Sequence, residues 1–281
     1  MASIPLCVPF SCKDEARRAG AWWDGRQRIW RCSPELLATD AYLRLEPFIP
    51  RMHRPDLEPP YIAPRMVPQM AWGRNLRAVL HPEQWDVVRG AAYAATDKRC
   101  RVCAGRDAGG RIEADEDWEY DDEALTFTLK DVVALCPACH HVVHWGKSMG
   151  DGREHETYAQ LMYVNRWSRP VAERVVAAAY AEWRRRALLP WTGDYSWVTR
   201  THGFEISRAG LERAEAMNRA IVAKAIRQDE EAERAKRMVA TPIPPRKPSI
   251  AAPTTAPRPP PKPEPTPKKQ SIMGLLRSLV R

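Results

Sequence analysis

The 281-residue chain is predicted to adopt an α+β fold with a small N-terminal αβ module, a central domain and a C-terminal arm. Three observations support this prediction. A tryptophan-rich segment with an Asp24-Gly25 turn opens the chain. Two CxxC pairs, one at Cys100 and one at Cys136, enclose two strand-like segments and precede a helix rich in histidine. Twelve of the thirty residues in 241–270 are proline, so that segment cannot build a core.

Residues 1–48 are predicted to form the small αβ module. The segment 4–10 predicts a short strand, and 13–20 predicts a helix that Gly20 ends. The segment 21–32 predicts a hairpin, because Asp-Gly is a favoured two-residue turn between strands. The module is therefore expected to be a helix packed on a small antiparallel sheet.

The hairpin of this module carries an alternation of tryptophan and arginine that has two interpretations. The residues concerned are Trp22, Trp23, Trp30, Arg26, Arg28 and Arg31. A platform for single-stranded nucleic acid needs this combination, and Arg26 and Arg28 would then be nucleic-acid contacts. Alternatively, the tryptophans form the core of a small unit that has little else to bury, and we favour this interpretation.

The rest of the chain is predicted to be largely helical outside the CxxC region. Residues 49–71 are proline-rich and extended, and helices are expected at 72–95, with Pro82 in its first turn, and at 170–188, capped by Ser168. A long charged helix is expected at 205–238. Its narrow apolar stripe would dock on the body or on a partner, and consists of Leu211, Ala214, Met217 and Ile221.

The C-terminal arm is predicted to be a disordered linker, 241–270, followed by an apolar and basic docking peptide, 271–281. The segment 270–275 loosely resembles the peptide Q-x-x-[LM]-x-[FL] that binds sliding clamps, which makes a clamp a candidate protein partner. A membrane surface is a second candidate partner.

Residues 241–281 hold eight Lys or Arg and one Glu, so they carry +7 of the net charge of +9. Such a tail favours polyanions, or it keeps the chain in solution. The candidate nucleic-acid contacts are Lys147, Arg246, Lys247, Lys268 and Lys269.

Composition also limits the compartment. No apolar run is long enough to span a bilayer, and the N-terminus lacks the order of a signal peptide. Seven cysteines, four of them in CxxC pairs, fit a reducing compartment and metal binding better than a disulfide framework. We therefore expect a cytoplasmic protein without a transmembrane segment, and leave its oligomeric state open. Cys7, Cys12 and Cys32 lack ligand spacing and are expected to be small apolar residues.

The two CxxC pairs predict one structural Zn²⁺ site. Each pair places two thiolates on one tight turn, and a tetrahedral zinc ion needs four such ligands. The ligands would be Cys100, Cys103, Cys136 and Cys139. Between the pairs the sequence predicts two antiparallel strands, the first of them acidic, and a helix that begins in the second pair. The histidines of that helix, His140, His141 and His144, suggest a metal-dependent nuclease site beside the zinc.

Over residues 64–198 the chain resembles a bacterial HNH-endonuclease family that has a ββα-metal fold and a four-cysteine zinc site. The resemblance lies in the stretches 68–77, 85–103, 118–122, 135–147 and 164–168. It implies metal-dependent cleavage of DNA with Mg²⁺ or Mn²⁺, in a phage, plasmid or defence setting. The N-terminal module resembles a small uncharacterised bacterial module with the pattern VPxxxKDEAxxxGAxWD.

The chain departs from this family at the general base. Members carry a histidine where this chain has Asp115, and no histidine lies between Cys103 and Cys136. Three interpretations are open. In the first, Asp115, Glu113 or Glu116 serves as base or metal ligand and the enzyme cuts slowly. In the second, the acidic cluster binds a divalent ion but catalysis is lost. In the third, the segment is only a structural zinc module.

We take DNA cleavage as the leading hypothesis, with Asp115, His140 and Glu113 as the catalytic candidates. The resemblance implies that His144, with Asp115 or Glu113, holds the catalytic divalent ion and that His140 orients water or phosphate. His141 is expected to be an exposed helix residue. The alternative is an inactive HNH-like adaptor that binds nucleic acid.

Overall fold

The computed structural model describes residues 3–240 and confirms the α+β fold. The chain divides into two compact units, Met1–Ile221 and Val222–Arg281, and the boundary falls within the last helix, α10. The predicted linker at 241–270 and docking peptide at 271–281 lie outside the described residues. None of the helices in the described range 3–240 is both long and apolar enough to cross a membrane. The predicted domain boundaries stay predictions.

The N-terminal module contains the strand, helix and hairpin that its sequence predicts. Its sheet is antiparallel with the order β1-β3-β2. Asp24 fixes the hairpin turn, because its carboxylate accepts hydrogen bonds from the backbone N–H groups of Arg26 and Gln27, both at 3.0 Å. The elements are β1 (Ile4–Leu6), α1 (Lys13–Arg18), β2 (Trp22–Asp24), β3 (Ile29–Cys32) and α2 (Ala41–Leu45).

The tryptophans of this module do not all belong to its core. Trp30, on the central strand β3, is 8% exposed and packs in the core, as we favoured. Trp22 and Trp23 are 43% and 46% exposed, so the core interpretation is wrong for them. Both lie on β2, which is an edge strand, and Trp23 contacts Trp30 edge-to-face with ring centroids 5.9 Å apart.

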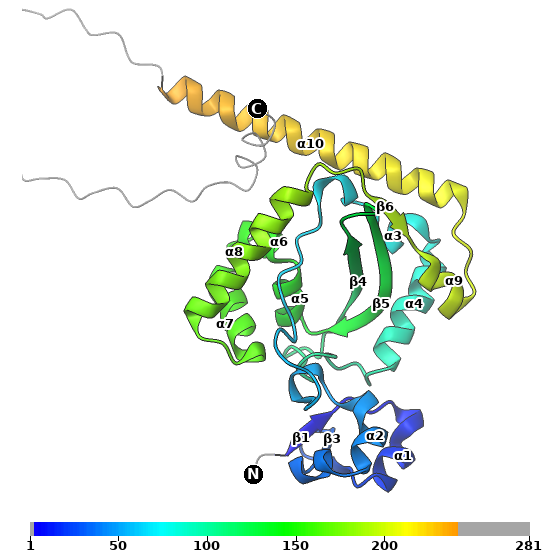
Figure 1. Cartoon of the computed structure of the whole chain (residues 1–281). Coiled ribbons are helices and arrows are strands. Elements are labelled where there is room, and N and C mark those ends of the chain that lie inside the picture. Colours follow the sequence, from blue (N-terminus) through cyan, green and yellow to red (C-terminus); the bar gives the residue numbers. More distant parts are fainter. Residues whose placement is uncertain (1–2, 241–281) are drawn as a thin grey trace, which may run out of the picture. The chain divides into compact units, whose positions relative to one another are not determined.

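The central sheet is the predicted hairpin with one added strand. β4 (Glu113–Asp121) and β5 (Thr126–Leu135) are antiparallel, and β6 (Thr192–Asp194) pairs in parallel with β5. α5 (Pro137–Val143) lies on one face of the hairpin and α4 (Pro82–Ala94) on the other (Figure 1). Apolar side chains of β5 supply both interfaces, with Val133 and Leu135 on the side of α5. Leu129 and Val132 contribute to the core that includes α4.

The other helices surround this sheet. The predicted helix at 72–95 is in fact two helices, because Pro82 lacks an N–H group and His81 before it is extended, with φ −69° and ψ 151°. The predicted helix at 170–188 is α8 (Arg169–Arg186), and three further helices around the sheet, α6, α7 and α9, were not predicted. The remaining helices of the first unit are α3 (Leu76–Val79), α6 (Trp145–Gly150), α7 (Glu154–Asn165), α8 (Arg169–Arg186) and α9 (Ser196–His202). Short 3-10 helices occur at Phe10–Cys12, Pro34–Ala38, Glu46–Phe48, Arg51–His53 and Gln69–Ala71.

The long helix α10 (Arg208–Ala240) packs through small and polar residues at its start, within the first unit. A Cβ added at Gly210 would lie 2.1 Å from the carbonyl oxygen of Val79, so the two backbones are in close contact. Asn218 is buried and donates to the carbonyl oxygens of Gln69 and Trp72. Of the predicted apolar stripe only Ala214 is buried, and its three larger members, Leu211, Met217 and Ile221, are each more than a third exposed. Met217 and Ile221 nevertheless approach Gly73, where an added Cβ would lie 2.9 and 3.0 Å from their side chains. Gly210, Ala214, Met217 and Ile221 share one side of the helix, so the predicted stripe docks on the body, with its larger side chains at the partly exposed margin of the contact.

Candidate functional site

Four cysteines from two distant segments converge at the start of α5. Cys100 and Cys103 follow α4, Cys136 is the N-cap residue of α5, and Cys139 lies in its first turn. The Sγ atom of Cys103 lies 3.7 Å from the Sγ atoms of both Cys136 and Cys139. Zinc–sulfur bonds of about 2.3 Å in a tetrahedron place the sulfurs roughly 3.8 Å apart. The cluster therefore fits a structural zinc ion.

The surroundings of the cluster suit thiolates. The backbone N–H of Gly105 donates to Cys103 Sγ at 3.4 Å, and Gln160 Nε2 lies 3.1 Å from Cys139 Sγ. Such donors orient metal-bound sulfur and spread its charge. Cys100 and Cys139 have no exposed surface, so solvent does not compete with their contacts. Hydrogen bonds from the three neighbouring thiols lower the pKa of Cys136.

A second group of potential metal ligands lies where β4 meets α5. Asp115 comes from β4, His140 from α5 and His144 from the residue that ends α5, and their ligand atoms lie within 4.8 Å of one another. His144 Nε2 is 3.3 Å and His140 Nε2 is 3.9 Å from Asp115 Oδ1. The two histidines share one side of the helix because they are four residues apart, and the N–H of His144 still bonds to the carbonyl oxygen of His140. Because α5 begins at Cys136, the cysteine cluster also positions these histidines.

Glu113 contacts the far side of the His140 ring. Its carboxylate pairs with His140 Nδ1, so Nε2 is left facing Asp115. A carboxylate on the second ring nitrogen is the usual support of a metal-binding histidine, because it fixes both tautomer and orientation. Burial, together with the charge of His144, lowers the pKa of His140, which favours the neutral ring that can act as a ligand. Glu113 is thus placed behind His140 rather than within the group of three.

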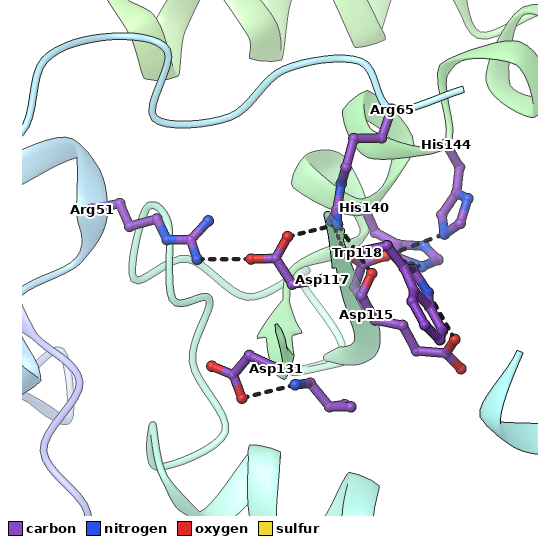
Figure 2. A network of polar contacts seen from close by, with 10 residues as sticks. Arg51, Arg65, Asp115, Asp117, Trp118, Asp131, His140 and His144 are labelled. Carbon is purple, nitrogen blue, oxygen red and sulfur yellow. Dashed lines mark hydrogen bonds and ion pairs between the residues drawn. The ribbon is translucent and has the colours of Figure 1, made fainter. Parts of the chain in front are cut away.

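Arg65 holds the carboxylates of β4 from the other side. Its guanidinium pairs with both Asp115 and Asp117, and Arg51 pairs with Asp117 at 3.2 Å (Figure 2). Asp115 is only 3% exposed. Burial by itself would raise the pKa of Asp115, but the hydrogen bond with His144 and the charge of Arg65 outweigh it and lower that pKa. Asp115 is therefore an ionised, firmly held carboxylate.

Arg65 was not among the site residues predicted from the sequence. It lies in the proline-rich segment 49–71, fifty residues before Asp115, and no motif marks it. The only available signal was the run of acids at 113–122, whose burial in a folded protein requires cations from elsewhere.

Glu116 belongs to the opposite face of β4. Its carboxylate accepts hydrogen bonds from the backbone N–H of Leu76 at 3.0 Å and from Trp118 Nε1 at 3.1 Å. Burial raises the pKa of Glu116 to about 7, against the effect of these hydrogen bonds. Alternation along the strand explains why Glu116 faces α3 while Asp115 faces α5.

A cavity of about 640 Å³ opens beside the group of three, and Asp115, His140 and His144 form part of its wall. Its cationic lining residues are Arg65, Arg74, Arg77 and Arg186. Three of these pair with carboxylates: Arg65 as above, Arg74 with Glu215, and Arg186 with Asp122 and Glu182. Arg77 stacks over the ring of Trp85 at 5.3 Å and forms no ion pair within residues 3–240. It is exposed and so can receive an anion.

The other predicted site residues lie apart from this cavity. Arg26 and Arg28 are exposed in the β2–β3 turn, and Lys147 is exposed on α6, where it pairs with Asp151 at 2.6 Å. His141 is half-buried and outside the group of three. The predicted contacts Arg246, Lys247, Lys268 and Lys269 lie outside the described residues.

Comparison with protein-family models, curated proteins and solved structures finds no match to this chain. A function must therefore be inferred from the geometry of the two ligand groups and the cavity. That geometry is compatible with metal binding at both groups.

Proposed function

We propose that the chain is an HNH-type, metal-dependent endonuclease that hydrolyses phosphodiester bonds in DNA. One observation carries this proposal. Asp115, His140 and His144 converge at the junction of β4 and α5, beside a cavity that Arg77 also lines. A purely structural zinc module needs the four cysteines but gives no reason for a second, partly open group of ligands next to them.

The chemistry of the ligands narrows the choice of ion. Asp115, His140 and His144 would hold it through one carboxylate oxygen and two imidazole nitrogens. Magnesium prefers oxygen ligands, whereas imidazole suits later transition metals, and manganese accepts both kinds. We therefore expect Mn²⁺ to support activity better than Mg²⁺. When bound, the ion supplies Lewis acidity at the scissile phosphate and stabilises the leaving oxygen.

The residues of the chain divide the remaining tasks. Arg77, which lines the cavity and is exposed, would bind a phosphate oxygen of the DNA backbone, because its guanidinium has no ion pair within 4.0 Å among residues 3–240. Glu113 holds the ring of His140, and Arg65 holds the carboxylate of Asp115. Hydrolysis adds water across the P–O bond and leaves a phosphate monoester and a hydroxyl group.

Asp115 suits the role of ligand better than that of general base. Its pKa is lowered, so it is a weak proton acceptor at neutral pH, and both of its oxygens already have partners. No histidine on β4 supplies the missing base. We accordingly expect slow cleavage.

Arg65 favours one alternative function. A guanidinium paired with Asp115 opposes a divalent cation at the same carboxylate, both by repulsion and by occupying an oxygen. A chain in which Arg65 replaces the ion would bind nucleic acid without cutting it. This is the inactive adaptor.

Cleavage assays separate the two functions. Supercoiled and single-stranded DNA are incubated with the protein and Mn²⁺, Mg²⁺ or EDTA, beside the variants His144→Ala and His141→Ala. His141 is the matched control because it lies on the same helix but outside the group of three. We expect cutting with Mn²⁺ that His144→Ala abolishes and His141→Ala retains. Equal cutting by His144→Ala would refute the proposal, and binding without any cutting would establish the adaptor.

A further inference from the structure

A second cavity, of about 650 Å³, lies between the N-terminal module and the segment that leads into the first CxxC pair. It is remote in sequence from Asp115, His140 and His144, and none of those residues lines it. A ligand bound in this cavity would serve a role beyond the proposed cleavage and independent of it. The lining residues that matter here are Phe10, Trp23, Arg28, Lys98, Arg99 and Arg106.

The two walls of this cavity are joined by specific contacts. Arg101 donates to the carbonyl oxygens of Pro47 and Ile49 at 2.9 and 3.0 Å. Cys7 Sγ donates to the carbonyl oxygen of Cys100, and a small buried cluster of Cys7, Ile29 and Ala104 fills the junction. The cavity is therefore held open by packed chain on both sides.

One wall presents aromatic faces to solvent. Phe10 is 78% exposed and Trp23 is 46% exposed, and both line the cavity. Trp22 is exposed to a similar extent, 43%, but it does not line the cavity, because neighbouring residues on a strand point to opposite faces. Exposed aromatic rings beside cations are the arrangement on which bases stack.

The other wall is cationic and under-compensated. Arg106 pairs at 3.6 Å with Asp97, which is the only acid among the described residues that line the cavity, and Lys98 is exposed. Across the cavity, the exposed Arg28 of the N-terminal module adds a further cation. Arg99 is 9% exposed, and its guanidinium donates to the carbonyl oxygens of Ala104 and Arg28. Within the described residues it forms no ion pair. Its positive charge therefore faces only neutral carbonyl oxygens, and an anion in the cavity would supply the missing counter-charge.

We propose that this cavity binds single-stranded DNA, with bases stacked on Trp23 and Phe10 and phosphates held by Arg28, Lys98 and Arg106. Charge complementarity favours a polyanion, and the exposed rings favour one whose base faces are accessible. A duplex hides those faces in its own stack. The same side chains give no pocket for alternate apolar residues, as a peptide ligand would need.

The test measures fluorescence anisotropy of a short labelled oligothymidylate with the zinc-loaded, full-length protein and no other divalent ion. Trp23→Ala is compared with Trp22→Ala, and Arg28→Asn with Arg26→Asn; asparagine tolerates the left-handed backbone of Arg28, whose φ is +51°. We expect Trp23→Ala to weaken binding about fivefold or more and Trp22→Ala less than about twofold. Arg28→Asn should weaken binding and reduce its salt dependence, whereas Arg26→Asn should do neither.

Two results would overturn the proposal: equal losses in Trp22→Ala and Trp23→Ala, or binding of a duplex as tight as that of the single strand. Oligouridylate that binds as tightly as oligothymidylate supports stacking without selection of the sugar. The assay is repeated with His141→Ala, whose residue lies outside both the group of three and this cavity, and binding should be unchanged. Because no cleavage is measured, failure of this proposal and failure of the proposed nuclease are distinguishable.

Discussion

Removing one cysteine of the cluster should release zinc and destabilise the fold. The perturbation is Cys136→Ala, and the control is Cys32→Ala, which removes a sulfur that is also buried but belongs to the core of the N-terminal module. Both are made in the His144→Ala background, so that the Asp115 group cannot hold a zinc ion and confuse the stoichiometry. The two variants differ only in whether the lost sulfur lies in the cluster.

The expected magnitude is derived from linkage. An ion that binds only the native state, at a free concentration of about 1,000 Kd, stabilises it by about 4 kcal/mol. For a unit of this size each kcal/mol shifts the melting temperature by roughly 2–4 °C, so loss of zinc should lower it by about 8–16 °C. Cys32→Ala leaves a small cavity and should cost only about 1 kcal/mol, or roughly 2–4 °C.

The assay is metal analysis after dialysis, followed by calorimetry with and without a zinc chelator. We expect one zinc per chain in the background protein and in Cys32→Ala, and none in Cys136→Ala. The chelator should lower the melting temperature of the first two and leave the third unchanged. One zinc per chain in Cys136→Ala, or a background protein indifferent to the chelator, would refute the four-cysteine assignment.

Two further predictions concern stability. Gly210→Ala should lower the free energy of unfolding by about 1–3 kcal/mol, because the new Cβ would lie 2.1 Å from the carbonyl oxygen of Val79. Gly90→Ala, where the new Cβ has nothing within 4 Å, should raise it by about 0.5–1 kcal/mol. Urea unfolding measures both changes, and equal effects would contradict the close helix contact. Burial raises the pKa of the Cys7 thiol to about 12 from its ordinary value of 9.0, so the folded state keeps a proton that the unfolded state loses. This contribution to stability is complete below pH 9 and is lost as the pH rises towards 12. Between these pH values the free energy of unfolding should therefore fall less steeply in Cys7→Val than in the unaltered protein. Identical slopes of the free energy of unfolding against pH would disprove the prediction.

The sequence predicted the elements whose signals are local. The Asp24-Gly25 turn gave the first hairpin, Gly20 ended the first helix, and the CxxC pair at Cys136 marked the start of α5. Each of these depends on residues within one or two turns of chain. The prediction of one helix at 72–95 was wrong, because Pro82 excludes the helical conformation for His81 before it and so divides the segment into two helices. The stripe on α10 was predicted on the side that packs against the body, but the close backbone contact at Gly210 on that same side was not predicted.

The candidate site shows the same division. Sequence by itself determined which types of ligand are present and at what spacing. The two cysteines of each CxxC pair, and His140 and His144, are only three or four residues apart, so they stay close together in any fold. Only the tertiary structure decided that Glu113 stands behind His140, that Arg65 neutralises Asp115, and that Trp23 rather than Trp22 lines the second cavity. Burial, pKa and pairing are set by contacts through space between segments tens of residues apart, and no local pattern encodes them.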